Sequence, residues 1–142
     1  MLTLHDSHGS TNAIKVRVLL HELGLEWTAI ELEQGAPRPE GYTDLHPFGL
    51  IPTLVDGAVV ITESNVALRY LAERAARADL RGATPAERAR IDGLLDSLSL
   101  ELRPALWGVE AFAIYGGEAD DRGARVAALE HQLTAYDTLL HP

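Results

Sequence analysis

The chain has 142 residues, of which 46% are hydrophobic and 23% charged, a composition that is typical of a folded globular protein rather than a disordered chain. The formal net charge of −9 and the lack of Lys/Arg-rich runs argue against a surface that binds nucleic acid. No apolar stretch approaches the ~20 residues that a membrane-spanning helix needs, and the first residues lack the pattern of a signal peptide, so we expect a cytoplasmic protein without a membrane partner.

The sequence contains no cysteine. This excludes disulfide bonds, thiolate metal sites and redox chemistry that uses a thiol of the protein. Any thiol chemistry therefore depends on a thiol that a ligand supplies. His5 and His8 are close in sequence, but no further cluster of ligands accompanies them, so we predict no metal site. We place the other histidines on the surface: His21, His46, His131 and His141.

The first part of the chain predicts alternating strands and helices. Apolar residues recur at i, i+3, i+4 and i+7 from Val16 to Leu23, which is typical of an amphipathic helix, and Gly24 stands where such a helix ends. The elements expected here are a strand at 2–4, a polar loop at 5–12, a helix at 13–24, a strand at 26–32 and an irregular loop with one helical turn at 33–44.

The centre of the chain predicts a hairpin and then a helix. Two apolar runs, 53–55 and 58–61, are separated only by an Asp-Gly pair, which between β-branched residues is a strong signal for a tight turn. Hydroxyl and acidic residues at 62–64 then open a helical pattern that ends near Arg77. The order strand, helix, strand, hairpin, helix favours a mixed α/β unit.

Ile51 and Pro52 stand directly before the hairpin. A proline at the mouth of a strand leaves the backbone N–H and C=O of the preceding residue free, and an extended peptide can pair with them. The helix N-terminus at Glu63 and Ser64 offers N–H groups to an anion. This geometry suggests a receptor for a small peptide that carries a carboxylate. The alternative is an ordinary hairpin followed by a capped helix.

The rest of the chain predicts helices. Thr-Pro-Ala-Glu at 84–87 is a strong helix start, and the helix that follows should be kinked or interrupted by Pro104 and broken by the glycine pair at 116–117. A last helix is expected at about 121–140. The expected organisation is therefore a first domain at 1–78, a linker at 79–84 and a partial all-helical domain at 85–142, in a chain that is either a fragment or a natural short form.

The segments P-F-G-L-I-P-T-L at 47–54 and E-S-N-V-A-L-R-Y-L at 63–71 resemble the glutathione-binding half of the cytosolic glutathione S-transferases. The resemblance extends from Leu2 to about Leu140. It implies a thioredoxin-like α/β first domain with a mixed sheet, followed by an incomplete all-α second domain. It also implies glutathione as co-substrate, a small hydrophobic electrophile, and a homodimer that pairs the first domain of one subunit with the second domain of the other.

For the glutathione site, the resemblance implies a role for four residues. The proline that Pro52 matches is cis in the family, and the residue that Ile51 matches pairs its backbone with the cysteinyl part of glutathione. The pair that Glu63 and Ser64 match holds the γ-glutamyl end.

At one position the chain departs from the family. Many members carry a polar residue that meets the glycyl carboxylate of glutathione where this chain has Leu50. Arg38, in the loop after the second strand, could compensate. We therefore expect glutathione to bind more weakly here than in relatives with a polar residue at this position.

The segment S-T-N-A-I-K-V-R at 10–17 resembles the serine-type motif of the zeta, theta and related bacterial classes, and its first serine is Ser10. A hydroxyl just before a helix can accept a helix N–H and still donate its own proton to a bound thiolate, which lowers the pKa of the thiol and creates the nucleophile. Thr11, Asn12 and Ser7 are alternatives for this role. The simpler interpretation is that Ser10 only caps the helix.

In the family, the long helix of the second domain borders the electrophile site, so Trp107, Phe112 and Tyr115 are candidates for it; packing in a core or interface is the alternative. We expect an enzyme that attaches the glutathione thiolate to a small electrophile or catalyses a related isomerisation. The alternative is a non-catalytic module of the same fold that works through protein contacts, or an inactive fragment.

Overall fold

The computed structural model describes residues 1–114, 116–117 and 120–140. The chain divides into two compact units, Met1–Glu87 and Arg88–Pro142. The division falls inside the helix that opens the predicted second domain, α5 (Pro85–Ser97). The segment predicted as a linker at 79–84 is not simply extended, because its first half belongs to a short helix, α4 (Ala78–Arg81).

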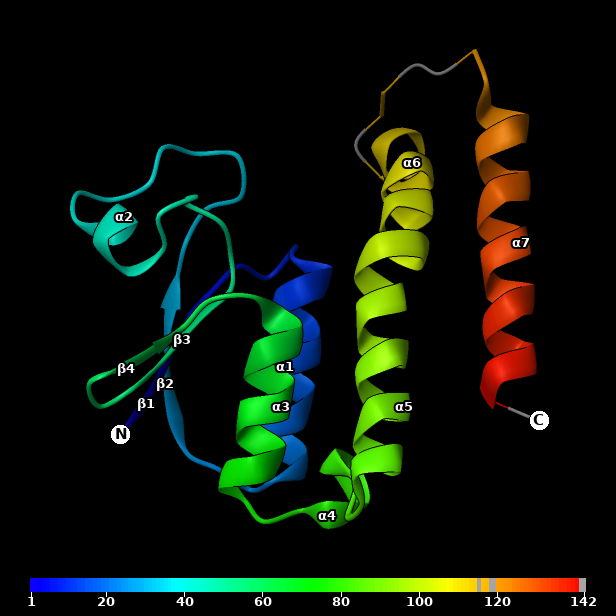
Figure 1. The fold of residues 1–142 in the computed structure, drawn as a ribbon. Helices are drawn as coiled ribbons and strands as arrows, with labels where there is room; N and C mark the ends of the chain where they lie inside the picture. The colour runs from blue at the N-terminus through cyan, green and yellow to red at the C-terminus, as the bar shows by residue number, and fades with distance from the viewer. Residues whose placement is uncertain (115, 118–119, 141–142) are drawn as a thin grey trace. The chain divides into compact units, whose positions relative to one another are not determined.

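The first unit is built on a four-stranded mixed sheet with the order β2-β1-β3-β4 (Figure 1). The central strand β1 pairs in parallel with β2 and antiparallel with β3, and β3 pairs antiparallel with β4. The strands span β1 (Leu2–Asp6), β2 (Trp27–Glu31), β3 (Thr53–Asp56) and β4 (Val59–Ile61). This sheet confirms the predicted mixed α/β unit. The hairpin turn is Gly57-Ala58, one residue later than predicted, because Asp56 pairs with Val59 and Gly57 supplies the positive φ of 60°.

Two helices, α1 (Thr11–Glu22) and α3 (Ser64–Arg74), cover one face of the sheet (Figure 1). Alternate residues of β1 point into this face, so Leu2 and Leu4 are buried beneath the helices. Helix α3 ends three residues before the predicted end at Arg77. The core of the unit combines residues of both helices with residues of the strands: Leu2, Leu4, Val16, Leu20, Leu54, Ile61, Ala67 and Leu71.

The predicted helical turn in the irregular loop is present as α2 (Tyr42–Leu45). Its first residue, Tyr42, is 3% exposed, and its ring lies 5.4 Å from the ring of His5 in β1. The hydroxyl of Tyr42 lies 2.8 Å from Oγ1 of Thr53 in β3. Since His5 and Thr53 are register partners across β1 and β3, Tyr42 attaches α2 to the end of the sheet from which the site loops emerge.

The second unit consists of helices. The predicted start of α5 is confirmed, because Glu87 N–H donates to Thr84 Oγ1 while Glu87 Oε2 accepts from the N–H of Thr84. After α5 come a π-helical segment, η1 (Leu98–Leu102), and α6 (Arg103–Ala113). Pro104 has no N–H to donate to the carbonyl four residues earlier, so an interruption of the helix was expected there. The interruption is a π-helical hydrogen bond, in which the N–H of Arg103 donates to the C=O of Leu98, five residues earlier.

The last helix is α7 (Arg122–Leu140), which packs along α6 and η1. A hydrogen bond of 2.6 Å joins Ser97 Oγ of α5 to the hydroxyl of Tyr136, which is buried in α7. In the described part of the chain, no helix combines the length and hydrophobicity needed to span a bilayer.

Candidate functional site

The first unit contains a small pocket of about 60 Å³. Three segments of the chain meet there: the start of α1, the loop between α2 and β3, and the start of α3. The structure therefore brings together several of the residues predicted from the sequence and adds one that was not predicted. The lining residues are Asn12, His46, Leu50, Ile51, Pro52, Glu63 and Ser64.

One wall of the pocket is the edge formed by residues 50–52. The Ile51-Pro52 peptide bond is cis, the isomer that the family resemblance implies. Neither the N–H nor the C=O of Ile51 has a hydrogen-bond partner within the described part of the chain. Because backbone polar groups are strong donors and acceptors, this edge can pair with an extended ligand.

The opposite wall is the N-terminus of α3. Glu63 has φ 64° and ψ 113°, a conformation that residues other than glycine rarely adopt and that costs about 1–3 kcal/mol. Ser64, the first residue of the helix, is 7% exposed and lines the pocket. A helix of this length carries partial positive charge at its N-terminus, which suits a carboxylate.

The loop before α1 carries the candidates for contact with a thiol. Ser10 is the N-cap of α1, and its Oγ accepts from Ala13 N–H at 3.3 Å, so the hydroxyl proton is not used in the cap. Thr11 differs, because its Oγ1 is buried and has no hydrogen-bond partner among the described residues. Asn12 lines the pocket directly.

Asp6 holds this loop in place. Its side chain, 1% exposed, accepts from the N–H of Ser7 at 2.6 Å and from Arg17 of α1 at 2.9 Å. Ser7 is also buried, and its carbonyl accepts from the N–H of Ser10 at 2.9 Å. The buried carboxylate therefore ties the end of β1, the loop and α1 into one arrangement that fixes where Ser10 stands.

Arg38 does not line the pocket. Its Nε donates to the carbonyl of Gly49 at 2.8 Å, and its Nη1 donates to the carbonyl of Glu33 at 2.9 Å. The side chain thus joins the loop after β2 to the segment before Leu50. In this arrangement it stabilises the loop, and no Lys or Arg is among the described residues that line the pocket with Leu50.

The prediction that His46 lies on the surface was wrong. His46 is 2% exposed and lines the pocket. Its ring stacks on Tyr42 at 6.5 Å and meets Phe48 edge-on at 6.2 Å, and its Nδ1 has no hydrogen-bond partner among the residues described. An irregular loop has no hydrophobic period, so nothing in the local sequence separates a buried histidine from an exposed one. The one available signal was that His46 directly precedes the segment 47–54, which carries the family resemblance.

The aromatic candidates on α6 lie in the second unit. Trp107 is 47% exposed and lies 5.3 Å from the guanidinium of Arg103, while Phe112 lies 5.2 Å from that of Arg122. Five residues along a helix correspond to a rotation of about 140°, so these two rings face different directions. The third candidate, Tyr115, lies outside the described residues.

Ionisable groups near the pocket show one clear perturbation. Burial lowers the pKa of His5, whose ring packs against Tyr42, so this imidazole is held neutral to lower pH than usual. Within the described ranges, no group of three or more His, Cys, Asp or Glu side chains could hold a metal ion.

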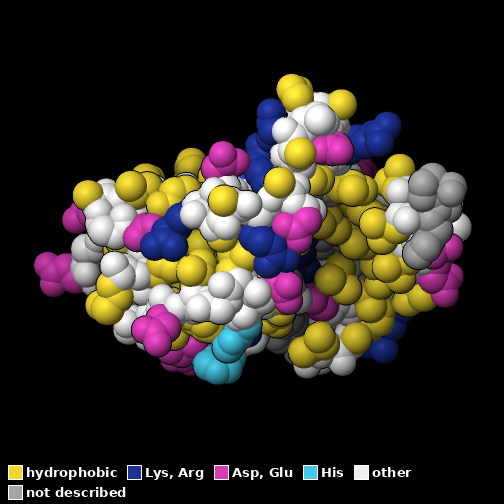
Figure 2. Space-filling view, turned by 90° about the horizontal axis from the view of Figure 1, so that it is seen from below, with side chains coloured by type: hydrophobic (Ala, Val, Ile, Leu, Met, Phe, Trp, Pro, Cys, Tyr) yellow, Lys and Arg dark blue, Asp and Glu magenta, His cyan; other side chains and the backbone are white. Residues whose placement is uncertain are grey.

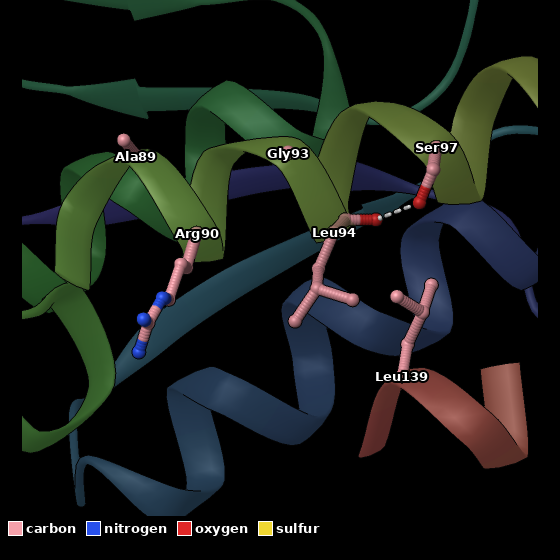
Figure 3. A pocket seen from close by; sticks show the side chains of 6 residues that line it. All are labelled: Ala89, Arg90, Gly93, Leu94, Ser97 and Leu139. Carbon is pink, nitrogen blue, oxygen red and sulfur yellow. Dashed lines mark hydrogen bonds between the residues drawn. The ribbon is translucent and has the colours of Figure 1, made fainter. Parts of the chain in front are cut away.

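The second unit has a larger cavity of about 590 Å³ between α5 and α7 (Figure 3). Apolar side chains such as Leu94 and Leu139 line it, with Arg90 at one side. Ser97 Oγ donates to the carbonyl of Leu94 at 2.9 Å and so turns toward its own helix. The sequence did not predict this cavity, because its walls come from helices that are distant in the chain.

Comparison with known proteins identifies relatives of the first unit and of the whole chain. Residues 9–74 match the family described as "Glutathione S-transferase, N-terminal domain". The chain is also similar to the solved theta class glutathione S-transferase from the citrus canker pathogen Xanthomonas axonopodis pv. citri with glutathione bound. The two are 31% identical with a TM-score of 0.83, and the alignment covers 98% of this chain and 70% of that one.

Two curated relatives match over shorter lengths. Glutathione S-transferase 3 of Zea mays is 36% identical over 107 residues, which are 72% of this chain and 48% of that protein. The Stringent starvation protein A homolog of Haemophilus influenzae is 29% identical over 106 residues, which are 75% of this chain and 50% of that protein. The chain thus spans about half the length of these curated relatives.

Proposed function

Because the chain belongs to the glutathione S-transferase family, we propose that it binds glutathione in the pocket of the first unit and transfers its thiolate to a small hydrophobic electrophile. The pocket is the observation that supports this most strongly. It places the backbone of Ile51 opposite the N-terminus of α3, so a peptide backbone and a terminal carboxylate each have a suitable partner. The theta class relative was itself solved with glutathione bound.

In this proposal each part of glutathione is bound by different residues of the pocket. Ile51 pairs with the cysteinyl part, and Glu63 and Ser64 hold the γ-glutamyl end. Leu50 faces the glycyl end without a charge. The side chain of Arg38 donates to three backbone carbonyls, so we assign it to holding the loop rather than to binding the ligand.

Ser10 is proposed to stabilise the thiolate. Its oxygen accepts the helix N–H, so its hydroxyl proton is available to the sulfur, and the N-terminus of α1 adds partial positive charge. Both effects favour the ionised form and lower the pKa of the thiol from its usual ~8.5. The thiolate then forms a bond to the electrophilic carbon, while the leaving group departs with its electron pair or the acceptor takes up a proton.

Asn12 is the alternative donor, since its side chain belongs to the pocket lining. The buried Oγ1 of Thr11 is the least suited of the three, because a ligand could reach it only after the side chain rotates. Ser7 is a buried residue of the same loop, and we assign it a role in the structure of that loop.

We also propose that the protein forms a homodimer. Each unit exposes large apolar side chains, with Phe48 at 81% in the first unit and Leu139 at 57% in the second. Pairing the first unit of one copy with the second unit of another would cover both.

Trp107 and Phe112 remain candidates for contact with the electrophile.

The test of this function is binding followed by turnover. Calorimetry should show saturable binding of glutathione to the whole chain, and steady-state assays with a panel of electrophiles should show glutathione-dependent product. A chain that binds no glutathione would contradict the proposal.

A second candidate function is a non-catalytic module of the same fold that acts through protein contacts. One observation favours it: a relative that is 29% identical to this chain is named Stringent starvation protein A homolog rather than a transferase. Binding of glutathione without turnover of any electrophile in the panel would support this alternative.

A further inference from the structure

The hydroxyl of Tyr42 bridges the two sides of the Ile51-Pro52 bond. It lies 2.6 Å from the carbonyl oxygen of Leu50, on one side, and 2.8 Å from Oγ1 of Thr53, on the other. Tyr42 itself is not among the residues that line the pocket. It therefore contacts the binding edge from behind, through the protein.

The chemistry of the three groups fixes the direction of these bonds. A carbonyl oxygen can only accept, so Tyr42 donates its single hydroxyl proton to Leu50. The bond between Tyr42 and Thr53 must then have Thr53 as the donor. The result is a continuous series from Thr53 Oγ1 through Tyr42 Oη to the carbonyl of Leu50, with the ligand-binding edge between its two ends.

The phenol ring is held as firmly as the hydroxyl. Tyr42 is 3% exposed and lies between the rings of His5, at 5.4 Å, and His46, at 6.5 Å. The backbone N–H of His46 also donates to the carbonyl of Tyr42 at 3.0 Å. Because His5 of β1 and His46 of the pocket wall both contact the ring, its hydroxyl has little freedom to leave Leu50.

We propose that Tyr42 is a positioning residue for glutathione: its hydroxyl sets the orientation of the Leu50 and Ile51 peptide units that pair with the ligand. This role rests on the proposed function of the pocket. A carbonyl that loses its donor is free to rotate toward water or toward the ligand side, and the edge then no longer presents its N–H and C=O groups in the arrangement that a peptide needs.

The test compares three variants of the whole chain by calorimetry, steady-state kinetics and thermal unfolding. Tyr42→Phe removes one hydroxyl and keeps the ring, and we expect the Kd and KM for glutathione to rise about tenfold while kcat stays within about twofold, because the edge is used for binding and not for thiolate stabilisation. Thr53→Val keeps the bond from Tyr42 to Leu50, so its effect on Kd should be smaller.

The matched control is Tyr70→Phe, which removes a hydroxyl that donates to Asp56 at 2.8 Å, at the opposite end of β3. It should lower the unfolding temperature without changing the Kd. If the wild-type chain binds glutathione and Tyr42→Phe binds it equally well, the positioning role is wrong and the proposed function stands. Equal losses of affinity in Tyr42→Phe and Thr53→Val would also overturn it, since they would indicate general loosening. If the wild-type chain binds no glutathione, both proposals are wrong.

Discussion

Leu50 is the residue of the pocket whose chemistry fits glutathione least well. Its side chain is 54% exposed and lines the pocket, and it offers nothing to a carboxylate. Arg38, which was expected to compensate for Leu50, donates instead to the carbonyls of Gly49 and Glu33. A terminal carboxylate at this position would therefore be bound mainly through backbone groups.

We predict that Leu50→Lys tightens the binding of glutathione. A charge-assisted hydrogen bond contributes about 1.5–3 kcal/mol, so the Kd should fall by roughly ten- to a hundred-fold, measured by calorimetry. An analogue without the glycyl carboxylate serves as the control and should bind both proteins alike. If the variant binds glutathione no better than the wild type, another group already meets that carboxylate.

Ser10 carries a second prediction at the scale of one residue. Ser10→Ala should lower kcat by roughly ten- to a hundred-fold, because the thiolate loses a hydrogen bond from a neutral donor to a charged acceptor, while the Kd for glutathione changes little. The pKa of the bound thiol should move back toward ~8.5, which the pH dependence of thiolate absorbance measures.

Comparison with Asn12→Ala separates the two candidate donors to the thiolate. If the thiolate profile is unchanged in Ser10→Ala but shifted in Asn12→Ala, the amide rather than the hydroxyl meets the sulfur. Loss of the cap bond to Ala13 will also reduce stability somewhat, so unfolding of both variants is followed in parallel.

At the scale of elements, the helix termini do more for the site than the helix interiors. α1 begins after Ser10 and α3 begins after Glu63, and both ends stand beside the loop that carries the cis peptide bond. The two helices also pack against each other, with Lys15 Nζ 2.5 Å from Asn65 Oδ1. The packing that buries the apolar core therefore also holds two helix N-termini at one pocket.

The start of α5 allows a test of local helix stability. Thr84→Ala removes the hydroxyl that accepts from Glu87 N–H at 3.2 Å and should lower the free energy of unfolding by about 0.5–2 kcal/mol, measured by denaturant titration. Thr134→Ala is the matched control: its hydroxyl bonds back to the carbonyl of Glu130 within α7, and alanine is a better helix former there, so stability should stay the same or rise slightly. Equal destabilisation by both variants would contradict the importance of the cap.

At the scale of the whole molecule, exposed apolar surface is the main feature. In the second unit, hydrophobic side chains gather over the α5 and α7 part of the surface, where the cavity of about 590 Å³ opens (Figure 2). Leu133 and Leu140 of α7 are 52% and 60% exposed. Apolar patches of this kind mark interaction sites more often than free surface.

We predict that the chain associates at micromolar concentration and that light scattering will give a mass near twice 15.4 kDa. Phe48→Ser should shift the population toward monomer, since it removes the aromatic side chain that is 81% exposed in the first unit. Val18→Ser is the control, because it removes an apolar side chain that is 61% exposed on α1. A wild-type monomer over this range would contradict the proposed homodimer.

The sequence alone determined the features that depend on neighbouring residues. The hairpin, the caps of α1 and α5 and the interruption before Pro104 follow from local chemistry, because a turn glycine, a capping hydroxyl and a missing N–H act within about five positions of themselves. The Ile51-Pro52 edge and the start of α3 were predicted for the same reason.

Only the tertiary structure decided how distant segments meet. Tyr42 reaches Thr53 and His5, His46 is buried at the pocket, and Asn12 joins residues 50–52 there. Arg38 was expected at the pocket but donates to the carbonyl of Glu33, in its own loop, and to that of Gly49, in the segment before Leu50. These contacts depend on the path of irregular loops over the sheet, and such loops carry no hydrophobic period from which burial or direction can be read.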